Sequence, residues 1–239
     1  MTSNGIPNGA TQDDSRAVFF FDIDNCLYPK SYKIHEHMSV LIDSYFQTHL
    51  SLSPEDATML HQRYYKDYGL AIEGLVRHHK VDPLEYNAKV DDALPLDDII
   101  KLDPHLRKLL QDIDRTKVKP WLFTNAYINH GKKVVRLLGI EDQFEGITYC
   151  DYGAEKLLCK PDPAMFDKAM REAGVRDPTK CYYVDDSAIN CVGGKKYGLK
   201  TVHLVEEGTK SPPEPACDHQ IKNLEELRGL FPEVFNPSS

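Results

Sequence analysis

The 239-residue sequence has no long hydrophobic run. Its longest uninterrupted apolar stretch is the five residues 17–21, whereas a membrane-spanning helix needs about 18 or more apolar residues. The first sixteen residues are polar and lack the apolar segment of a secretory signal peptide. We therefore expect neither membrane association nor secretion, and we predict a cytoplasmic location, with the nucleus as the alternative.

Paired cysteines and an excess of positive charge are also missing. The six cysteines are scattered, and no two of them form a Cys-x-x-Cys pair, which is typical of reduced thiols in an intracellular protein. Lysine and arginine number 29 against 37 acidic residues, for a formal net charge of -8. Nucleic acid polymers and anionic membranes repel an acidic chain, so we expect neither as a partner.

Motifs for several common sites are absent as well. The sequence contains neither the Gly-x-Gly-x-x-Gly pattern nor the P-loop pattern of nucleotide-binding folds. The histidine clusters at His35–His37 and His78–His79 lack a third ligand at zinc-binding spacing. These absences argue against a dinucleotide site, a P-loop and a zinc centre.

The sequence does contain short apolar strands that alternate with helical patterns. We predict strands at residues 18–23, 121–124, 146–149, 181–184 and 201–205. Asp103 with Pro104, and Asp162 with Pro163, each place an N-cap residue before a proline, which is typical of a helix start. Strands that alternate with helices indicate an α/β fold with a mostly parallel, Rossmann-like sheet.

Residues 32–102 interrupt this alternation, because they show only helical patterns, one of them starting at Ser53. We predict that they form a helical cap domain inserted after the first strand. The Rossmann-like core would then comprise residues 16–31 and 103–235, after a disordered tail at 1–15. Loops that follow parallel strands lie at the carboxyl edge of the sheet, where ligands bind, so the cap should cover the active site.

The first predicted strand ends in two carboxylates, Asp22 and Asp24. Residues i and i+2 of an extended segment point the same way, so both carboxylates should converge at the carboxyl edge of the sheet. Two such groups can hold a divalent cation through oxygen ligands, or they can act as nucleophile and acid–base. A strand that merely ends in a polar turn is the alternative.

Polar groups also follow the later strands. They are Thr124 with Asn125, Lys160 ahead of Pro161, and Asp185 with Asp186. Taken singly, each is explained by a turn or by a position on the surface. The two adjacent aspartates can equally complete a cation site begun at the first strand.

The order of these motifs resembles the haloacid dehalogenase-like superfamily, whose four motifs occur in the same order. The resemblance extends from Val18 to about Val205 and so covers nearly the whole chain. Finer matches look like the pyrimidine 5′-nucleotidase branch of fungi and plants. These matches are residues 22–28 (DIDNCLY), 68–69 (YG), 123–126 (FTNA), 138–140 (LGI), 144–146 (FEG), 159–161 (CKP) and 184–187 (VDDS).

The resemblance implies an enzyme, a phosphoric monoester hydrolase of the 5′-nucleotidase type. Asp22 would attack phosphorus and become an aspartyl phosphate, while Asp24 would protonate the leaving group and then activate water. Mg²⁺ would be bound by Asp22, by the backbone carbonyl of Asp24 and by Asp186, with Asp185 close by. A divalent cation would offset the repulsion between the carboxylate nucleophile and the phosphate.

The resemblance also implies how the phosphate would be bound. Lys160 would supply a positive charge, and Thr124 and Asn125 would donate hydrogen bonds to the phosphoryl oxygens. All three would therefore act in both catalysis and substrate binding.

The expected substrates are the pyrimidine nucleoside 5′-monophosphates UMP and CMP. A sugar phosphate or lysophosphatidic acid is the alternative substrate, and a catalytically idle relative that binds a metabolite is a further alternative. Base or ribose contacts are predicted for Tyr68, Arg77 and His78, which cluster polar and aromatic groups on one helical stretch. We expect a monomer or a homodimer.

Overall fold

The computed structural model describes residues 15–208 and 215–237, so nearly all of the tail predicted to be disordered lies outside the described residues. Within those residues, six strands form one sheet in the order β3-β2-β1-β4-β5-β6, and every neighbouring pair is parallel. The strands are β1 (Ala17–Phe21), β2 (Val118–Phe123), β3 (Ile147–Thr148), β4 (Tyr182–Asp185), β5 (Lys200–Leu204) and β6 (His219–Ile221). The predicted α/β class with a parallel sheet is confirmed.

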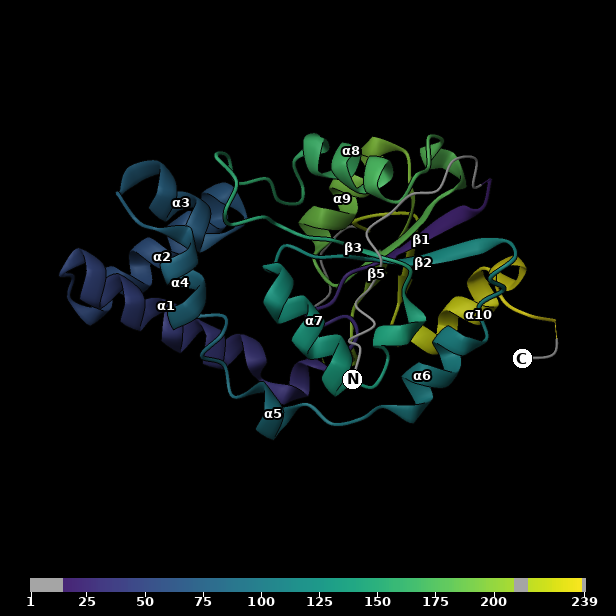
Figure 1. The fold of residues 1–239 in the computed structure, drawn as a ribbon, viewed down its shortest axis with the longest axis horizontal. Helices are drawn as coiled ribbons and strands as arrows, with labels where there is room; N and C mark the ends of the chain where they lie inside the picture. Colours follow the sequence, from purple (N-terminus) through teal and green to yellow (C-terminus); the bar gives the residue numbers. More distant parts are fainter. Residues whose placement is uncertain (1–14, 209–214, 238–239) are drawn as a thin grey trace, which may run out of the picture.

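Helices cover both faces of the sheet, with α8 and α9 on one side and α6, α7 and α10 on the other (Figure 1). The helices of the described chain are α1 (Ile34–Leu50), α2 (Pro54–Tyr68), α3 (Ala71–His78), α4 (Pro83–Lys89), α5 (Leu96–Ile99), α6 (Pro104–Gln111), α7 (Ile128–Leu137), α8 (Pro163–Glu172), α9 (Ala188–Tyr197) and α10 (Leu227–Leu230). Short 3₁₀ helices span Lys30–Tyr32, Glu141–Gln143, Pro178–Lys180, Leu224–Glu226 and Pro232–Val234. In residues 15–208 and 215–237, no helix combines the length and apolarity needed to cross a bilayer.

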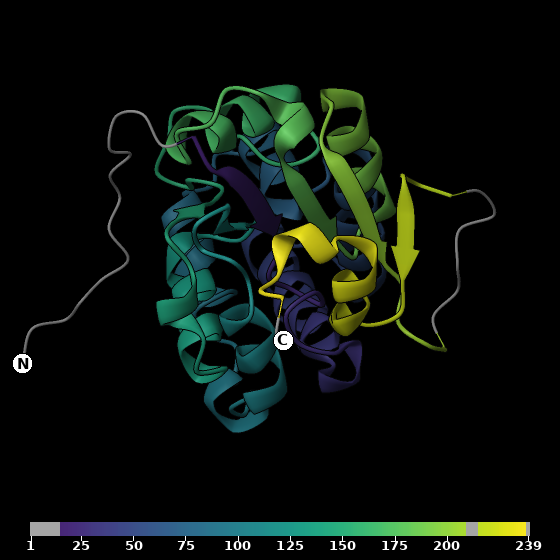
Figure 2. The same ribbon diagram turned by 90° about the vertical axis from the view of Figure 1, so that its right-hand side faces the viewer.

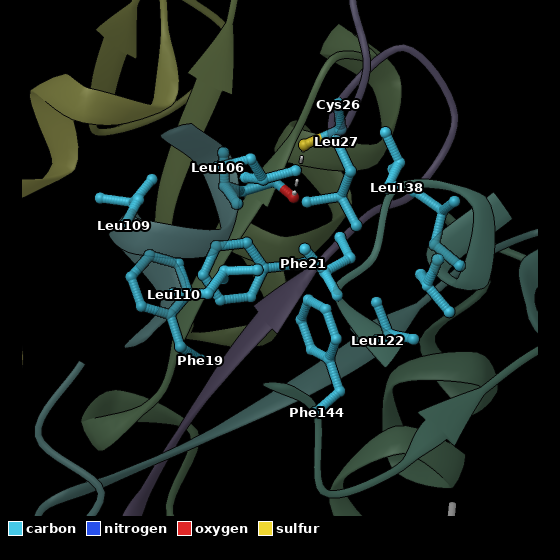
Figure 3. Packing of buried hydrophobic residues seen from close by; sticks show 14 of the residues in the cluster. Phe19, Phe21, Cys26, Leu27, Leu106, Leu109, Leu110, Leu122, Leu138 and Phe144 are labelled. Atoms are coloured by element: carbon cyan, nitrogen blue, oxygen red, sulfur yellow. Dashed lines mark hydrogen bonds between the residues drawn. The ribbon is translucent and has the colours of Figure 1, made fainter. Parts of the chain in front are cut away.

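The run of three phenylalanines in β1 is divided between the two faces of the sheet. Phe19 and Phe21 are buried on the face of α6 and α7, where they pack near Leu110 and Leu122 (Figure 3). Phe20 faces the opposite side, in a cluster with Phe166 of α8. Because successive side chains of a strand point to opposite faces, a strand buried on both sides needs this continuous apolar sequence.

The five predicted strands are all present, and each of their ends is shifted by one to three residues. β6 was not predicted. It is short, and its first two residues, His219 and Gln220, are exposed, so it lacks the apolar run of a central strand. It lies at one edge of the sheet (Figure 2), where its backbone pairs with only one neighbouring strand, β5.

Capping residues start the helices where the sequence indicated. The carboxylate of Asp103 accepts a hydrogen bond from the backbone N–H of Leu106 at the start of α6. Asp162 does the same for Ala164 at the start of α8. Such a side chain satisfies one of the backbone donors that the first turn leaves free, and is worth about 1 kcal/mol.

Helices α1–α5 fill the chain between β1 and α6, as the helical patterns predicted, and no strand interrupts them. Helices α1–α4 lie beside one end of the sheet (Figure 1) and share a hydrophobic cluster centred on buried residues such as Phe46, Ile72 and Leu75. The ends of the segment are different, because Ile34 and Leu96 pack into the main core beneath the sheet. The predicted division into a cap at 32–102 and a core stays a prediction.

Candidate active site

A cavity of about 550 Å³ lies at the carboxyl edge of the sheet. The predicted site residues that line it are Asp22, Asp24, Thr124, Asn125, Asp185 and Asp186. They lie at or just after the ends of three neighbouring strands, β1, β2 and β4, which end at the same edge because the strands are parallel. Lys160 is buried close behind them.

Lys160 joins the first and fourth motifs. Its Nζ donates hydrogen bonds to Asp22 Oδ1, to Asp185 Oδ2 and to the carbonyl oxygen of Phe123, each at 2.7 Å. Burial alone would lower the pKa of Lys160, but Asp185 and Asp22 outweigh burial and raise that pKa. The lysine therefore stays charged in a site from which water is largely excluded.

Asn125 holds the backbone of Lys160. Its side-chain amide donates to the Lys160 carbonyl oxygen at 3.0 Å and accepts from the Lys160 N–H at 2.7 Å. The amide that was predicted to bind phosphate thus positions the lysine, while still lining the cavity. Thr124 is fully buried, and its hydroxyl accepts from the Ala126 N–H at 3.0 Å.

Three carboxylates are suited to a divalent cation. Oxygen atoms of Asp22, Asp185 and Asp186 all lie within 4.8 Å of one another, and carboxylate oxygens are the ligands that Mg²⁺ prefers. Burial and the neighbouring Asp185 raise the pKa of Asp186 to about 6, against the opposing effect of Lys30, whose Nζ lies 2.9 Å from Asp186 Oδ2. This crowding of negative charge is what a bound Mg²⁺ would relieve, so the residues fit the ion.

The carboxylate of Asp24 is not part of this cluster. Its Oδ1 accepts a hydrogen bond from the Tyr28 hydroxyl and another from His130 Nε2, each at 2.7 Å. Burial alone would raise the pKa of Asp24, but the charge and hydrogen bond of His130, together with the Tyr28 hydrogen bond and the charge of Lys160, outweigh burial and hold that pKa below its usual value. Asp22 therefore lies beside the cation ligands, whereas Asp24 lies apart from them as an ionised carboxylate, the form in which a general base accepts a proton.

Sequence reasoning missed the roles of Tyr28 and His130. Tyr28 lies inside the first motif, four residues after Asp24, so its position gave a signal. His130 lies two residues after the start of α7, outside the motifs. Nothing in the sequence shows that His130 points at Asp24, because the two are 106 residues apart.

Tyr68, Arg77 and His78 do not line the cavity as the structure describes it. The Tyr68 hydroxyl lies 2.6 Å from His78 Nε2, the Arg77 guanidinium stacks over the Tyr68 ring, and Arg77 Nε donates to Glu73. The three residues contact one another on the outside of α2 and α3. The helical segment instead presents a different set to the cavity, which includes His35, Met38, Ile42, His61, Tyr65 and Tyr86.

The fold and the site together define a class of protein: an α/β protein whose parallel sheet carries aspartates at its carboxyl edge around a buried lysine. A sequence model described as haloacid dehalogenase-like hydrolase matches residues 17–198. The chain belongs to this family, as its motifs predicted. Hydrolases of this family generally use Mg²⁺, and the family supports an enzyme of the phosphatase type.

Particular relatives agree with this assignment. Phosphate metabolism protein 8 of Saccharomyces cerevisiae is 40% identical over 245 residues, which cover 95% of this chain and 76% of the relative. Among solved structures, CbbY from Rhodobacter sphaeroides in complex with phosphate superposes with a TM-score of 0.64 at 18% identity, over 89% of this chain and 96% of that one. A HAD phosphatase from Thermococcus onnurineus superposes with a TM-score of 0.59 at 18% identity, over 90% and 97%. At such identities the two structures show the fold alone.

Proposed function

We propose that the protein is a Mg²⁺-dependent phosphomonoesterase that hydrolyses the pyrimidine nucleoside 5′-monophosphates UMP and CMP through an aspartyl phosphate on Asp22. The observation that carries the phosphatase chemistry is the arrangement around Asp22. A buried lysine and two further aspartates surround this carboxylate. Asp24 lines the same cavity but is hydrogen-bonded to His130 instead of to the lysine.

Each residue has a task in this chemistry. Asp22 attacks phosphorus, while Lys160 and Thr124 place positive charge and a hydroxyl near the phosphoryl group. Asp24 gives a proton to the leaving oxygen and later takes one from the attacking water. Mg²⁺, held by Asp22, Asp186 and the Asp24 carbonyl with Asp185 close by, would neutralise phosphate charge when bound.

The pyrimidine assignment rests on the branch-like motifs and on the size and lining of the cavity. A volume of about 550 Å³ lies within the range of small-molecule sites, roughly 300–1,000 Å³. Tyr65, Tyr86 and His61 offer flat rings and polar tips to the part of the ligand remote from phosphorus. We further propose that helices α1–α4 act as a cap over this site and that the protein works in the cytoplasm.

The test is steady-state kinetics of phosphate release over a panel of esters, with and without EDTA. The panel contains UMP, CMP, AMP, GMP, a hexose phosphate and lysophosphatidic acid. The proposal expects the highest kcat/KM for UMP and CMP, and no turnover in EDTA. A preference for the sugar phosphate or the lipid would contradict the pyrimidine nucleotide as the substrate. Absence of phosphate release from every ester would overturn the assignment as a phosphatase.

A further inference from the structure

Two hydrogen-bond donors converge on one oxygen of Asp24. The Tyr28 hydroxyl and His130 Nε2 both lie 2.7 Å from Asp24 Oδ1. Among the residues that the structure describes, none donates a hydrogen bond to the other oxygen, Oδ2. The two oxygens of this carboxylate are therefore in different environments.

Both donors are held by rigid surroundings. The chain turns back directly after Asp24, with Asn25 in the left-handed region at φ 58°, so that Tyr28 reaches the carboxylate four residues earlier. Tyr28 is 3% exposed, and His130, in the first turn of α7, is 1% exposed. The donors thus come from the segments that follow β1 and β2, and both side chains are almost completely shielded from solvent.

This arrangement restricts how Asp24 can turn. A carboxylate that is free to rotate presents either oxygen to a reacting group, and the loss of orientation slows proton transfer. Two charge-assisted hydrogen bonds to Oδ1 oppose that rotation. They also occupy the lone pairs of Oδ1, so that Oδ2 is the oxygen available to a ligand in the cavity that Asp24 lines.

We propose that Tyr28 and His130 are positioning residues that orient Asp24, so that Oδ2 alone exchanges protons during catalysis. The proposal rests on the proposed phosphatase chemistry, but not on the pyrimidine substrate. In the first half-reaction an Asp22 oxygen bonds to phosphorus, the ester P–O bond breaks, and the leaving oxygen takes the proton from Oδ2. In the second, a water oxygen bonds to phosphorus, its proton passes to Oδ2, and the Asp22–phosphorus bond breaks to release inorganic phosphate.

The test compares two substrates whose leaving groups differ in their need for a proton. One is the alkyl phosphate that the wild-type enzyme hydrolyses best, and the other is p-nitrophenyl phosphate, whose phenolate leaves without a proton. Tyr28→Phe should lower kcat/KM for the alkyl ester by roughly 10- to 100-fold, as expected for the loss of a hydrogen bond to a charged group. For p-nitrophenyl phosphate, kcat/KM should change less than about threefold, because it reports only the steps up to release of the leaving group.

The second half-reaction provides an independent readout. With p-nitrophenyl phosphate the variant should show a lower kcat and accumulate phosphoenzyme in acid-quench labelling, because hydrolysis still needs Oδ2 as the base. His130→Gln, whose amide can donate to Oδ1, should retain more of the alkyl-ester activity than His130→Leu. Tyr197→Phe is the matched control, because it removes a phenol that donates to Asp167 on the far side of α8 and should change neither substrate.

An equal loss of kcat/KM for both substrates, without phosphoenzyme, would overturn the inference and leave Tyr28 and His130 as packing residues. Unchanged alkyl-ester kinetics in Tyr28→Phe would overturn it as well, whether or not the His130 variants fold. A wild-type enzyme that hydrolyses only a non-pyrimidine ester would change the proposed substrate and leave this comparison intact. A wild-type protein that releases phosphate from no ester would overturn the proposed function, and with it this inference.

Discussion

Among individual residues, a substitution at Asp22 should affect catalysis and stability in different ways. Asp22→Asn should abolish turnover, because the amide is nearly isosteric but cannot attack phosphorus. Burial raises the pKa of Asp22 despite the opposing Lys160, which means that the ionised carboxylate is a burden on the folded state. We therefore expect the metal-free variant to unfold at the same temperature as the wild type or higher, measured by circular dichroism. More than a few per cent of the wild-type kcat would contradict the nucleophile assignment.

Removing the positive charge of Lys160, which pairs with Asp22 and Asp185, should instead lower the stability of the protein. Lys160→Met leaves Asp22 and Asp185 buried without their ion pair, and breaking one side of such a pair typically costs about 3–5 kcal/mol. Urea denaturation in EDTA measures this loss alongside Asp22→Asn. If Asp22→Asn and Lys160→Met lost similar free energies of unfolding, repulsion among the buried carboxylates would not explain the stability of the site.

Asp91 should make stability depend on pH. It is 5% exposed, and burial, reinforced by Asp24, raises its pKa to about 6 against the opposing charge of His130. For an acid whose folded pKa is raised, the stabilising contribution is full below the unfolded pKa of about 4 and is lost as pH rises through the folded value. Relative to the wild type, Asp91→Asn should therefore gain about 1–3 kcal/mol of unfolding free energy between pH 5 and pH 8.

The matched control for Asp91 is Asp67→Asn, which removes the same charge from an exposed position on α2. Urea denaturation at both pH values, in EDTA, gives the difference directly. A pH profile of Asp91→Asn parallel to that of the wild type would show that Asp91 does not titrate in this range.

At the next level, helices α2 and α3 pack too closely for a side chain at Gly74. A Cβ atom there would lie 2.2 Å from Cγ of Tyr64, and Tyr64 is 7% exposed within the cluster of the helical segment. Gly74→Ala should lower the free energy of unfolding by about 1–3 kcal/mol, the usual range for overpacking. The measurement is urea denaturation followed by circular dichroism.

Gly229→Ala supplies the control for this substitution. Gly229 lies in α10, and a Cβ atom there would meet nothing within 4 Å. Since alanine is the better helix former by up to about 1 kcal/mol, this variant should be as stable as the wild type or slightly more so. Equal destabilisation by both substitutions would rule out the close approach of α2 and α3 as the cause.

For the molecule as a whole, Mg²⁺ should raise thermal stability. The chain carries a formal charge of -8, and Asp22, Asp185 and Asp186 bring three carboxylates close together, two of them buried. A ligand at 100 times its dissociation constant stabilises the folded state by about 2.7 kcal/mol, or roughly 5–10 °C in Tm for a chain of this size. Calorimetry in EDTA and in Mg²⁺, at ionic strength matched with NaCl, measures the shift.

Asp186→Asn should reduce that Mg²⁺-dependent shift and raise the Mg²⁺ concentration needed for half-maximal activity. The same Tm in EDTA and in saturating Mg²⁺ for the wild type would contradict a cation site at this cluster. Full activity in EDTA would contradict it independently.

Much of the fold and part of the site follow from local sequence. Apolar runs such as residues 17–21 favour strands buried on both faces, and capping residues such as Asp103 and Asp162 mark where helices begin. Because parallel strands all end at one edge, the residues after β1, β2 and β4 had to meet there. The convergence of Asp22, Thr124 and Asp185 was therefore predictable without coordinates.

The contacts between distant segments depend on packing instead. His130 meets Asp24 across 106 residues, and Asn125 turns its amide to the Lys160 backbone rather than only to the cavity. The helical segment presents Tyr65 to the cavity, while Tyr68, three residues later, points to His78 on the outside. The positions of the strands are set by local hydrophobic patterns, and in a parallel sheet these positions are enough to place the residues that follow the strands at one edge. The direction in which each side chain points is set by neighbours that only the folded chain brings together.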